Sequence, residues 1–206
     1  MQCILREKLM GQAMKLASVS NVYRTDSSRF VDAYLSWLEE AEKDLSSLRS
    51  PIVIVLQAEK SSLTSVLDGY LPSQIQEGRS IRKSQKAVAA QSLEKVSKEI
   101  YSKIESIDNT LDQFSEKLCH AIAVLAVREP ELYHRLQVNQ HGVDTIWKLL
   151  GRTQETIPIY NYFCAKLAST DINYLLMDII QKIVSNKTHA RELSMHSSHI
   201  CDDKQV

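Results

Sequence analysis

The stretch that decides the fold runs from Ser80 to Val127 and reads SIRKSQKAVAAQSLEKVSKEIYSKIESIDNTLDQFSEKLCHAIAVLAV. It contains neither proline nor glycine, and from Leu93 onward its apolar residues recur at steps of three and four. This spacing gathers the apolar residues on one side of an α-helix, in a heptad-like pattern with local stutters. The stretch therefore predicts one long helix around 80–127, about 70 Å in length if it is unbroken.

A break in this helix is the alternative, and Asp108–Asn109–Thr110 is the place for it. Asn109 can serve as an N-cap, and Asp112 would then lie in the first turn of a new helix. The apolar spacing nevertheless passes through these residues without a change of phase. We therefore expect the helix to be continuous.

The remainder of the chain favours an all-α fold. Five glycines and four prolines in 206 residues are too few for the frequent turns of a β-sandwich or barrel. The run Ile52–Leu56 is rich in β-branched residues, but it continues into helical spacing, so we expect a buried helix there rather than a strand. Further helices are expected at 1–17, 26–49, 130–138, 143–150, 157–168 and 171–185. The predicted fold is an elongated, all-α helical bundle.

The chain is expected to form a single helical domain over residues 1–185. From Asn186 onward the helical spacing of apolar residues fades, and residues 186–206 are predominantly polar. Such composition is typical of a disordered C-terminal tail.

Charge and cysteine content limit the function classes. The chain has 25 basic and 25 acidic residues, which argues against binding nucleic acid through bulk charge but not through a local patch. No apolar stretch approaches the length of a membrane-spanning helix, so no membrane partner is expected. The four cysteines form no C-x-x-C pair, which favours a reduced, cytoplasmic protein.

The motifs that carry common chemistry are missing from the sequence. The glycines are isolated, so there is no glycine-rich phosphate loop, and neither H-E-x-x-H nor G-x-S-x-G occurs. Glu131 and His134 form the one E-x-x-H pair, whereas a di-iron bundle needs two. His196 and His199 lie in the expected tail, where no fold would preorganise a metal site. We therefore expect a non-enzymatic protein without metal or cofactor.

A basic stripe is the feature that stands out. Arg79, Arg82, Lys83 and Lys86 are spaced so that a helix would present them on one side, with no acidic residue between them. Solvated surface residues would also give this pattern. The stripe nevertheless predicts a candidate site for nucleic acid or another anion, although no interleaved aromatic residues support a nucleic-acid reader.

The apolar seam of the long helix is the second candidate site, because a heptad-like stripe can pair with another helix. It comprises Leu93, Val96, Ile100, Ile104, Ile107, Leu111, Phe114 and Leu118. The same stripe would pack equally well inside a monomer.

Three hypotheses of function follow from these features. The leading one is a helical interaction or scaffold protein that acts through the apolar seam as a homodimer or complex subunit. The alternative is a nucleic-acid or anion-binding accessory protein that uses the basic stripe. A third is an enzyme or ligand binder with an interhelical pocket. That pocket would be lined by Trp147, Tyr160, Tyr162 and Tyr174.

Overall fold

The structure, a computed structural model, describes residues 1–26, 28–70, 80–132 and 136–198, with side chains described as far as residue 186. These residues form α-helices joined by short turns, and no strand occurs among them. The helices are α1 (Gln2–Thr25), α2 (Phe30–Ser46), α3 (Ile52–Leu67), α4 (Ile81–Arg128), α6 (Gln140–Leu150), α7 (Ile157–Lys166) and α8 (Ser169–Ser198). The predicted all-α bundle with one long helix is confirmed.

The contacts of the chain gather into two compact units. The N-terminal unit is Gln2–Asn109, and the C-terminal unit is Thr110–Val206 together with Met1. α4 has 48 residues, and it contributes its first part to the N-terminal unit and its second part to the C-terminal unit. The single helical domain expected over residues 1–185 stays a prediction.

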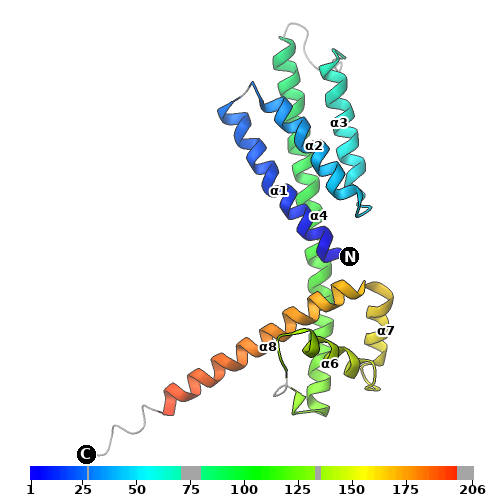
Figure 1. The fold of residues 1–206 in the computed structure, drawn as a ribbon, viewed down its shortest axis with the longest axis vertical. Coiled ribbons are helices and arrows are strands. Elements are labelled where there is room, and N and C mark those ends of the chain that lie inside the picture. The colour runs from blue at the N-terminus through cyan, green and yellow to red at the C-terminus, as the bar shows by residue number, and fades with distance from the viewer. Residues whose placement is uncertain (27, 71–79, 133–135, 199–206) are drawn as a thin grey trace, which may run out of the picture. The chain divides into compact units, whose positions relative to one another are not determined.

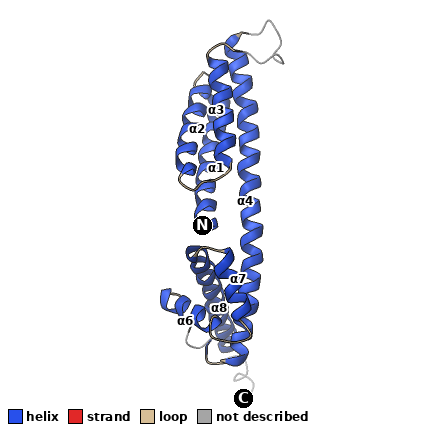
Figure 2. Cartoon of the chain, turned by 90° about the vertical axis from the view of Figure 1, so that its right-hand side faces the viewer, coloured by secondary structure: helices blue, strands red, loops and turns tan. Residues whose placement is uncertain are grey.

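In the N-terminal unit, α1, α2, α3 and the first half of α4 lie side by side and alternate in direction (Figure 1, Figure 2). Short connections after α1 and α2 favour this antiparallel arrangement. Large side chains of α2 form the centre of the unit, and they follow helical spacing. They are Phe30, Tyr34, Trp37, Leu38, Ala41 and Leu45.

The turn after α3 is built around Gly69, whose φ of +97° lies in the left-handed region. The backbone N–H of Gly69 donates to the carbonyl of Val66, and that of Tyr70 donates to the carbonyl of Ser65. A glycine in this conformation is the usual way to satisfy the last carbonyls of a helix. The strand alternative for Ile52–Leu56 is wrong, because that run lies in α3.

In the C-terminal unit, α6, α7 and α8 lie against the second half of α4 (Figure 1, Figure 2). The Asn139 side chain caps α6 by accepting a hydrogen bond of 2.9 Å from the backbone N–H of Gly142. The buried Thr156 hydroxyl donates to the carbonyl of Leu150 at 2.8 Å, which fastens the turn between α6 and α7. These two contacts fix the start of α6 and the turn that leads to α7.

Helix boundaries differ from expectation in several places. α4 is continuous through Asn109, so the alternative of a break there is wrong. α1 continues to Thr25 rather than ending at residue 17, because Val19 is buried and no glycine or proline interrupts residues 18–25. α8 continues past the expected end at 185 to Ser198. The helix expected at 130–138 falls partly on residues 133–135, which lie outside the described residues.

Candidate functional site

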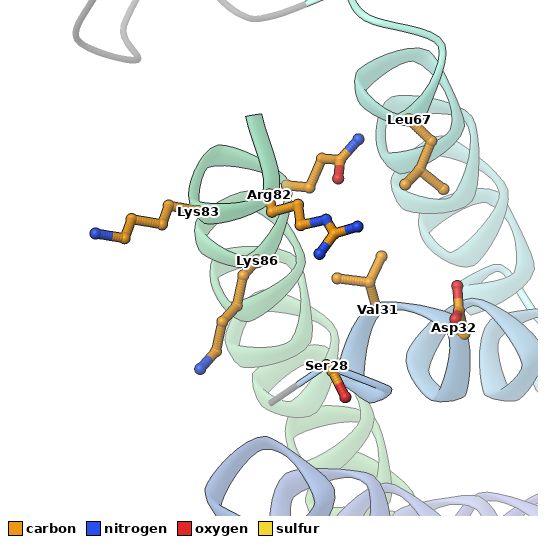
Figure 3. A pocket seen from close by; sticks show the side chains of 8 residues that line it. Ser28, Val31, Asp32, Leu67, Arg82, Lys83 and Lys86 are labelled. Carbon is orange, nitrogen blue, oxygen red and sulfur yellow. The ribbon is translucent and has the colours of Figure 1, made fainter. Parts of the chain in front are cut away.

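A pocket of about 600 Å³ lies at the end of the N-terminal unit where α3 ends and where α2 and α4 begin. Ser28, Val31 and Asp32 line it from the start of α2 (Figure 3). Leu67 lines it from the last turn of α3. The remaining wall comes from the first turns of α4 and includes three residues of the basic stripe, Arg82, Lys83 and Lys86. We call this site the basic pocket.

Arg82 is the cation that enters the basic pocket. Its side chain points from α4 into the space between α4, α2 and α3, toward Val31 and Asp32, whereas the Lys83 side chain points the other way (Figure 3). No carboxylate in the described part of the chain forms an ion pair with Arg82 or Lys83. The guanidinium group is therefore available to a ligand.

Lys86 is held in place by an aromatic ring. Its Nζ lies 4.3 Å from the centre of the Tyr23 ring near the end of α1, within the range of a cation–π interaction. The Tyr23 ring in turn packs edge-on against Phe30, with ring centres 4.9 Å apart. In Figure 3 the Lys86 side chain points away from Arg82, so its ammonium group does not enter the space that Arg82 occupies.

The structure thus brings three residues of the basic stripe to one site, and Arg79 lies outside the described residues. The buried side of α4 here is made of small residues, Ser84, Ala89 and Ser92. Ile81, by contrast, is 60% exposed. Because these buried side chains are small, the positions of large apolar residues in the sequence do not reveal this contact face.

The acidic residues of α2 are engaged in contacts between helices. Glu40 pairs with Lys15 of α1, and Glu42 pairs with Lys60 of α3. The hydrogen bond from Lys60, followed by one from Gln57, holds the pKa of Glu42 below its ordinary value. These two carboxylates fasten α2 to α1 and α3.

The apolar seam is covered by the chain itself. Val96, Ile100, Ile104 and Ile107 are buried in the N-terminal unit, and Leu111 and Leu118 are buried in the C-terminal unit. Leu93 and Phe114 are half-buried. Phe114 packs against Phe163 and Tyr162, with ring centres 5.6 and 6.1 Å away. The seam therefore has partners within the chain, and its use as an interface with a second protein stays a prediction.

The four aromatic residues named for an interhelical pocket do not form one group. Trp147 and Tyr160 are in contact, with ring centres 4.4 Å apart, and a hydrogen bond with Cys164 raises the pKa of Tyr160. Tyr162 belongs instead to the cluster around Phe114. Tyr174 is 50% exposed on α8. A pocket of about 190 Å³ is lined by Trp147 together with Cys164, Leu167, Ser169, Ile172 and Asn173.

Neither a metal-ligand cluster nor a disulfide occurs among the described residues. No three His, Cys, Asp or Glu side chains among them gather where they could hold a metal ion. Cys3, Cys119 and Cys164 form no disulfide, and Cys201 lies outside the described part. None of the described helices is both long and apolar enough to cross a membrane.

Several residues of the basic pocket could not be identified from the sequence. Val31, Asp32 and Leu67 follow ordinary helical patterns, and only packing brings them to α4. Tyr23 lies 63 positions before Lys86, and no local motif links the two.

Comparison with family models, with curated protein sequences and with solved structures finds no match to this chain. The function must therefore be argued from these residues.

Proposed function

We propose that the chain is a non-enzymatic, helical accessory protein that binds an anionic partner at the basic pocket. The observation that carries the proposal is that Arg82, Lys83 and Lys86 line one pocket of about 600 Å³. Arg82 points into that pocket, and no described carboxylate neutralises it (Figure 3). Pockets of this size are typical of ligand sites.

The position of these cations on α4 supports a binding role. They occupy the first turns of a helix, where the macrodipole favours acidic residues and each cation costs about 0.3–1 kcal/mol at low salt. The first turn of α4 contains no acidic residue. Departures from local preference of this kind concentrate at functional sites. A bound anion would offset the cost, because it would interact with both the side chains and the helix terminus.

The test is calorimetric titration of the chain with inorganic tripolyphosphate and with a single-stranded oligonucleotide, at about 50 and 200 mM salt. We expect binding to weaken steeply with salt and to be lost in the double variant Arg82→Glu/Lys83→Glu. The control is Lys98→Glu, which changes an exposed lysine of α4 that does not line the basic pocket. Absence of binding by both anions at low salt, or equal loss in the control, would overturn the proposal.

A scaffold function is the second candidate, and exposed apolar side chains on α1 favour it. Met14 is 73% exposed and Met10 40% exposed, one helical turn apart. They lie on the helix that lines a groove of about 270 Å³ with Ser97 and Tyr101 of α4, and Tyr101 is itself 54% exposed. Methionine-rich, exposed surfaces are adaptable in protein–protein contacts.

Light scattering after size exclusion tests this second candidate. A homodimer would have twice the chain mass of 23.4 kDa. The dimer should dissociate in the double variant Met14→Glu/Tyr101→Glu, which changes exposed positions and leaves the apolar seam intact. A mass of 23.4 kDa at all concentrations would remove self-association from consideration.

A further inference from the structure

We infer that the ligand of the basic pocket is a small organic phosphate, in which the carbon part carries a hydrogen-bond donor. The inference rests on the proposed anion-binding function and specifies its ligand. Three parts of the pocket wall carry the argument: the cations of α4, the apolar side chains Val31 and Leu67, and the polar pair Ser28 and Asp32.

The cations suit a phosphate group. The guanidinium group of Arg82 offers a planar set of donors that can bind two oxygens of one phosphate. Lys86 also lines the pocket, but its side chain points away from Arg82 (Figure 3), and its Nζ lies 4.3 Å from the centre of the Tyr23 ring. Arg82 is therefore the cation that a phosphate monoester would meet inside the pocket.

The apolar part of the wall distinguishes an organic ligand from a bare anion. Val31 and Leu67 face Arg82 across the pocket (Figure 3). A hydrated inorganic anion would leave these side chains in contact with water. A ligand with a carbon body would cover them, and burial of apolar surface adds to its affinity.

Asp32 adds a further requirement. The Asp32 carboxylate would repel a second anionic group, so the phosphate must lie on the side of Arg82. The carboxylate instead accepts a hydrogen bond from a hydroxyl or amino group of the ligand. The Ser28 hydroxyl donates to Asp26 at 2.6 Å, so its oxygen is also able to accept a bond. The ligand therefore carries its phosphate at one end and a donor at the other.

An extended nucleic-acid strand fits the described surface less well. A strand needs a continuous track of cations along its backbone. Beyond the basic pocket, however, Lys95 of α4 pairs with Glu59, and Lys60 pairs with Glu42. The pocket volume of about 600 Å³ also falls in the range typical of small-molecule sites.

The experiment compares inorganic phosphate, phenyl phosphate and adenosine monophosphate by calorimetric titration at low salt. Phenyl phosphate adds an apolar body to the anion, and adenosine monophosphate adds hydroxyl and amino donors as well. We expect affinity to rise in this order, with adenosine monophosphate at least about ten-fold tighter than inorganic phosphate. This comparison uses the unmodified chain and depends on no variant.

Single variants then measure how much each side chain of the pocket contributes to ligand affinity. Arg82→Gln should weaken all three ligands by about ten-fold or more, whereas Lys98→Gln, the matched control on α4, should change none. Val31→Thr, which keeps the side-chain shape, should weaken the two organic ligands alone. Asp32→Asn should lower the preference for adenosine monophosphate over phenyl phosphate. Circular dichroism of each variant verifies that it is folded.

The outcomes separate this inference from the proposed function. Equal affinity for inorganic and organic phosphates would overturn the inference and leave the anion-binding function standing. Binding of an oligonucleotide much tighter than binding of adenosine monophosphate would also overturn it, in favour of a nucleic-acid ligand. If tripolyphosphate, the oligonucleotide and all three phosphates fail to bind, both the inference and the proposed function fall.

Discussion

The hydroxyl groups of Tyr34 on α2 and Ser92 on α4 lie 2.9 Å apart in the interior of the N-terminal unit. Tyr34 is fully buried, and Ser92 is 4% exposed. The two residues are 58 positions apart, so this hydrogen bond ties the second helix to the long helix. Large buried side chains surround it, which makes it a specific polar contact in an otherwise apolar core.

Removal of one partner of this pair should cost more than removal of both. Tyr34→Phe leaves the Ser92 hydroxyl buried without a partner, and we expect it to lower the free energy of unfolding by about 1–3 kcal/mol. The double variant Tyr34→Phe/Ser92→Ala should lose less than the sum of the two single variants. Urea denaturation of the four proteins measures this coupling. Simple additivity would show that the hydroxyls do not interact.

Alkaline titration provides an independent measurement of the same residue. Burial raises the pKa of Tyr34 well above its ordinary value of 10. Above pH 10 the unfolded chain loses this proton while the folded chain keeps it, so stability falls as pH rises. The contribution of Tyr34 is thus complete below pH 10 and decreases by about 1.4 kcal/mol per pH unit above it. Tyr34→Phe should show a shallower decline, and an identical decline in both proteins would contradict the assignment.

Two glycine-to-alanine substitutions should have opposite effects. A Cβ added at Gly142 would lie 2.2 Å from the backbone oxygen of Gln137, which forces the backbone to move. We expect Gly142→Ala to destabilise the chain by about 1–3 kcal/mol. Gly11 lies within α1 with nothing within 4 Å of an added Cβ, so Gly11→Ala should stabilise by about 0.5–1 kcal/mol. Thermal unfolding measures both effects. A stabilising Gly142→Ala would contradict the close approach between Gly142 and the backbone oxygen of Gln137.

The buried seam of α4 can be tested with two isoleucines of the same helix. Ile100 is fully buried and Ile81 is 60% exposed. Ile100→Ala should therefore cost about 2–5 kcal/mol, and Ile81→Ala less than about 0.5 kcal/mol.

Protein concentration distinguishes a core within one chain from an interface between chains. If the seam is packed within one chain, the denaturation midpoint stays constant over about a hundred-fold range of concentration. A midpoint that rises with concentration would show that a second copy contributes to stability, and it would support the seam as an interface.

The long helix could be predicted because its signal is strong and local. Over 48 residues the apolar spacing keeps one phase, and Val96, Ile100 and Ile107 are buried as that phase requires. The sequence places the end of α1 too early, at residue 17, since residues 18–25 contain few large apolar side chains. Which helices cover the apolar seam depends on packing between distant segments of the chain. The spacing of apolar residues along one helix carries no information about that packing.

Only one wall of the basic pocket could be anticipated from the sequence. The spacing of Arg82, Lys83 and Lys86 puts them close together on α4, and all three line the pocket, whereas their role in binding an anion stays a prediction. The opposite wall could not be foreseen, because Val31 and Leu67 are ordinary helix residues whose position depends on how α2 and α3 end. Ser84 and Ala89 are buried where α4 packs against the bundle. Their side chains are too small to stand out in a pattern of large apolar residues.

The two tryptophans of the chain are divided between the two compact units. Trp37 is buried beside Tyr34 in the N-terminal unit, with ring centres 5.9 Å apart, and Trp147 is in contact with Tyr160 in the C-terminal unit. Each unit therefore contains its own intrinsic fluorophore. With one indole replaced by phenylalanine, the emission of the other reports the melting of a single unit, so that cooperativity along α4 becomes visible by fluorescence without any added label.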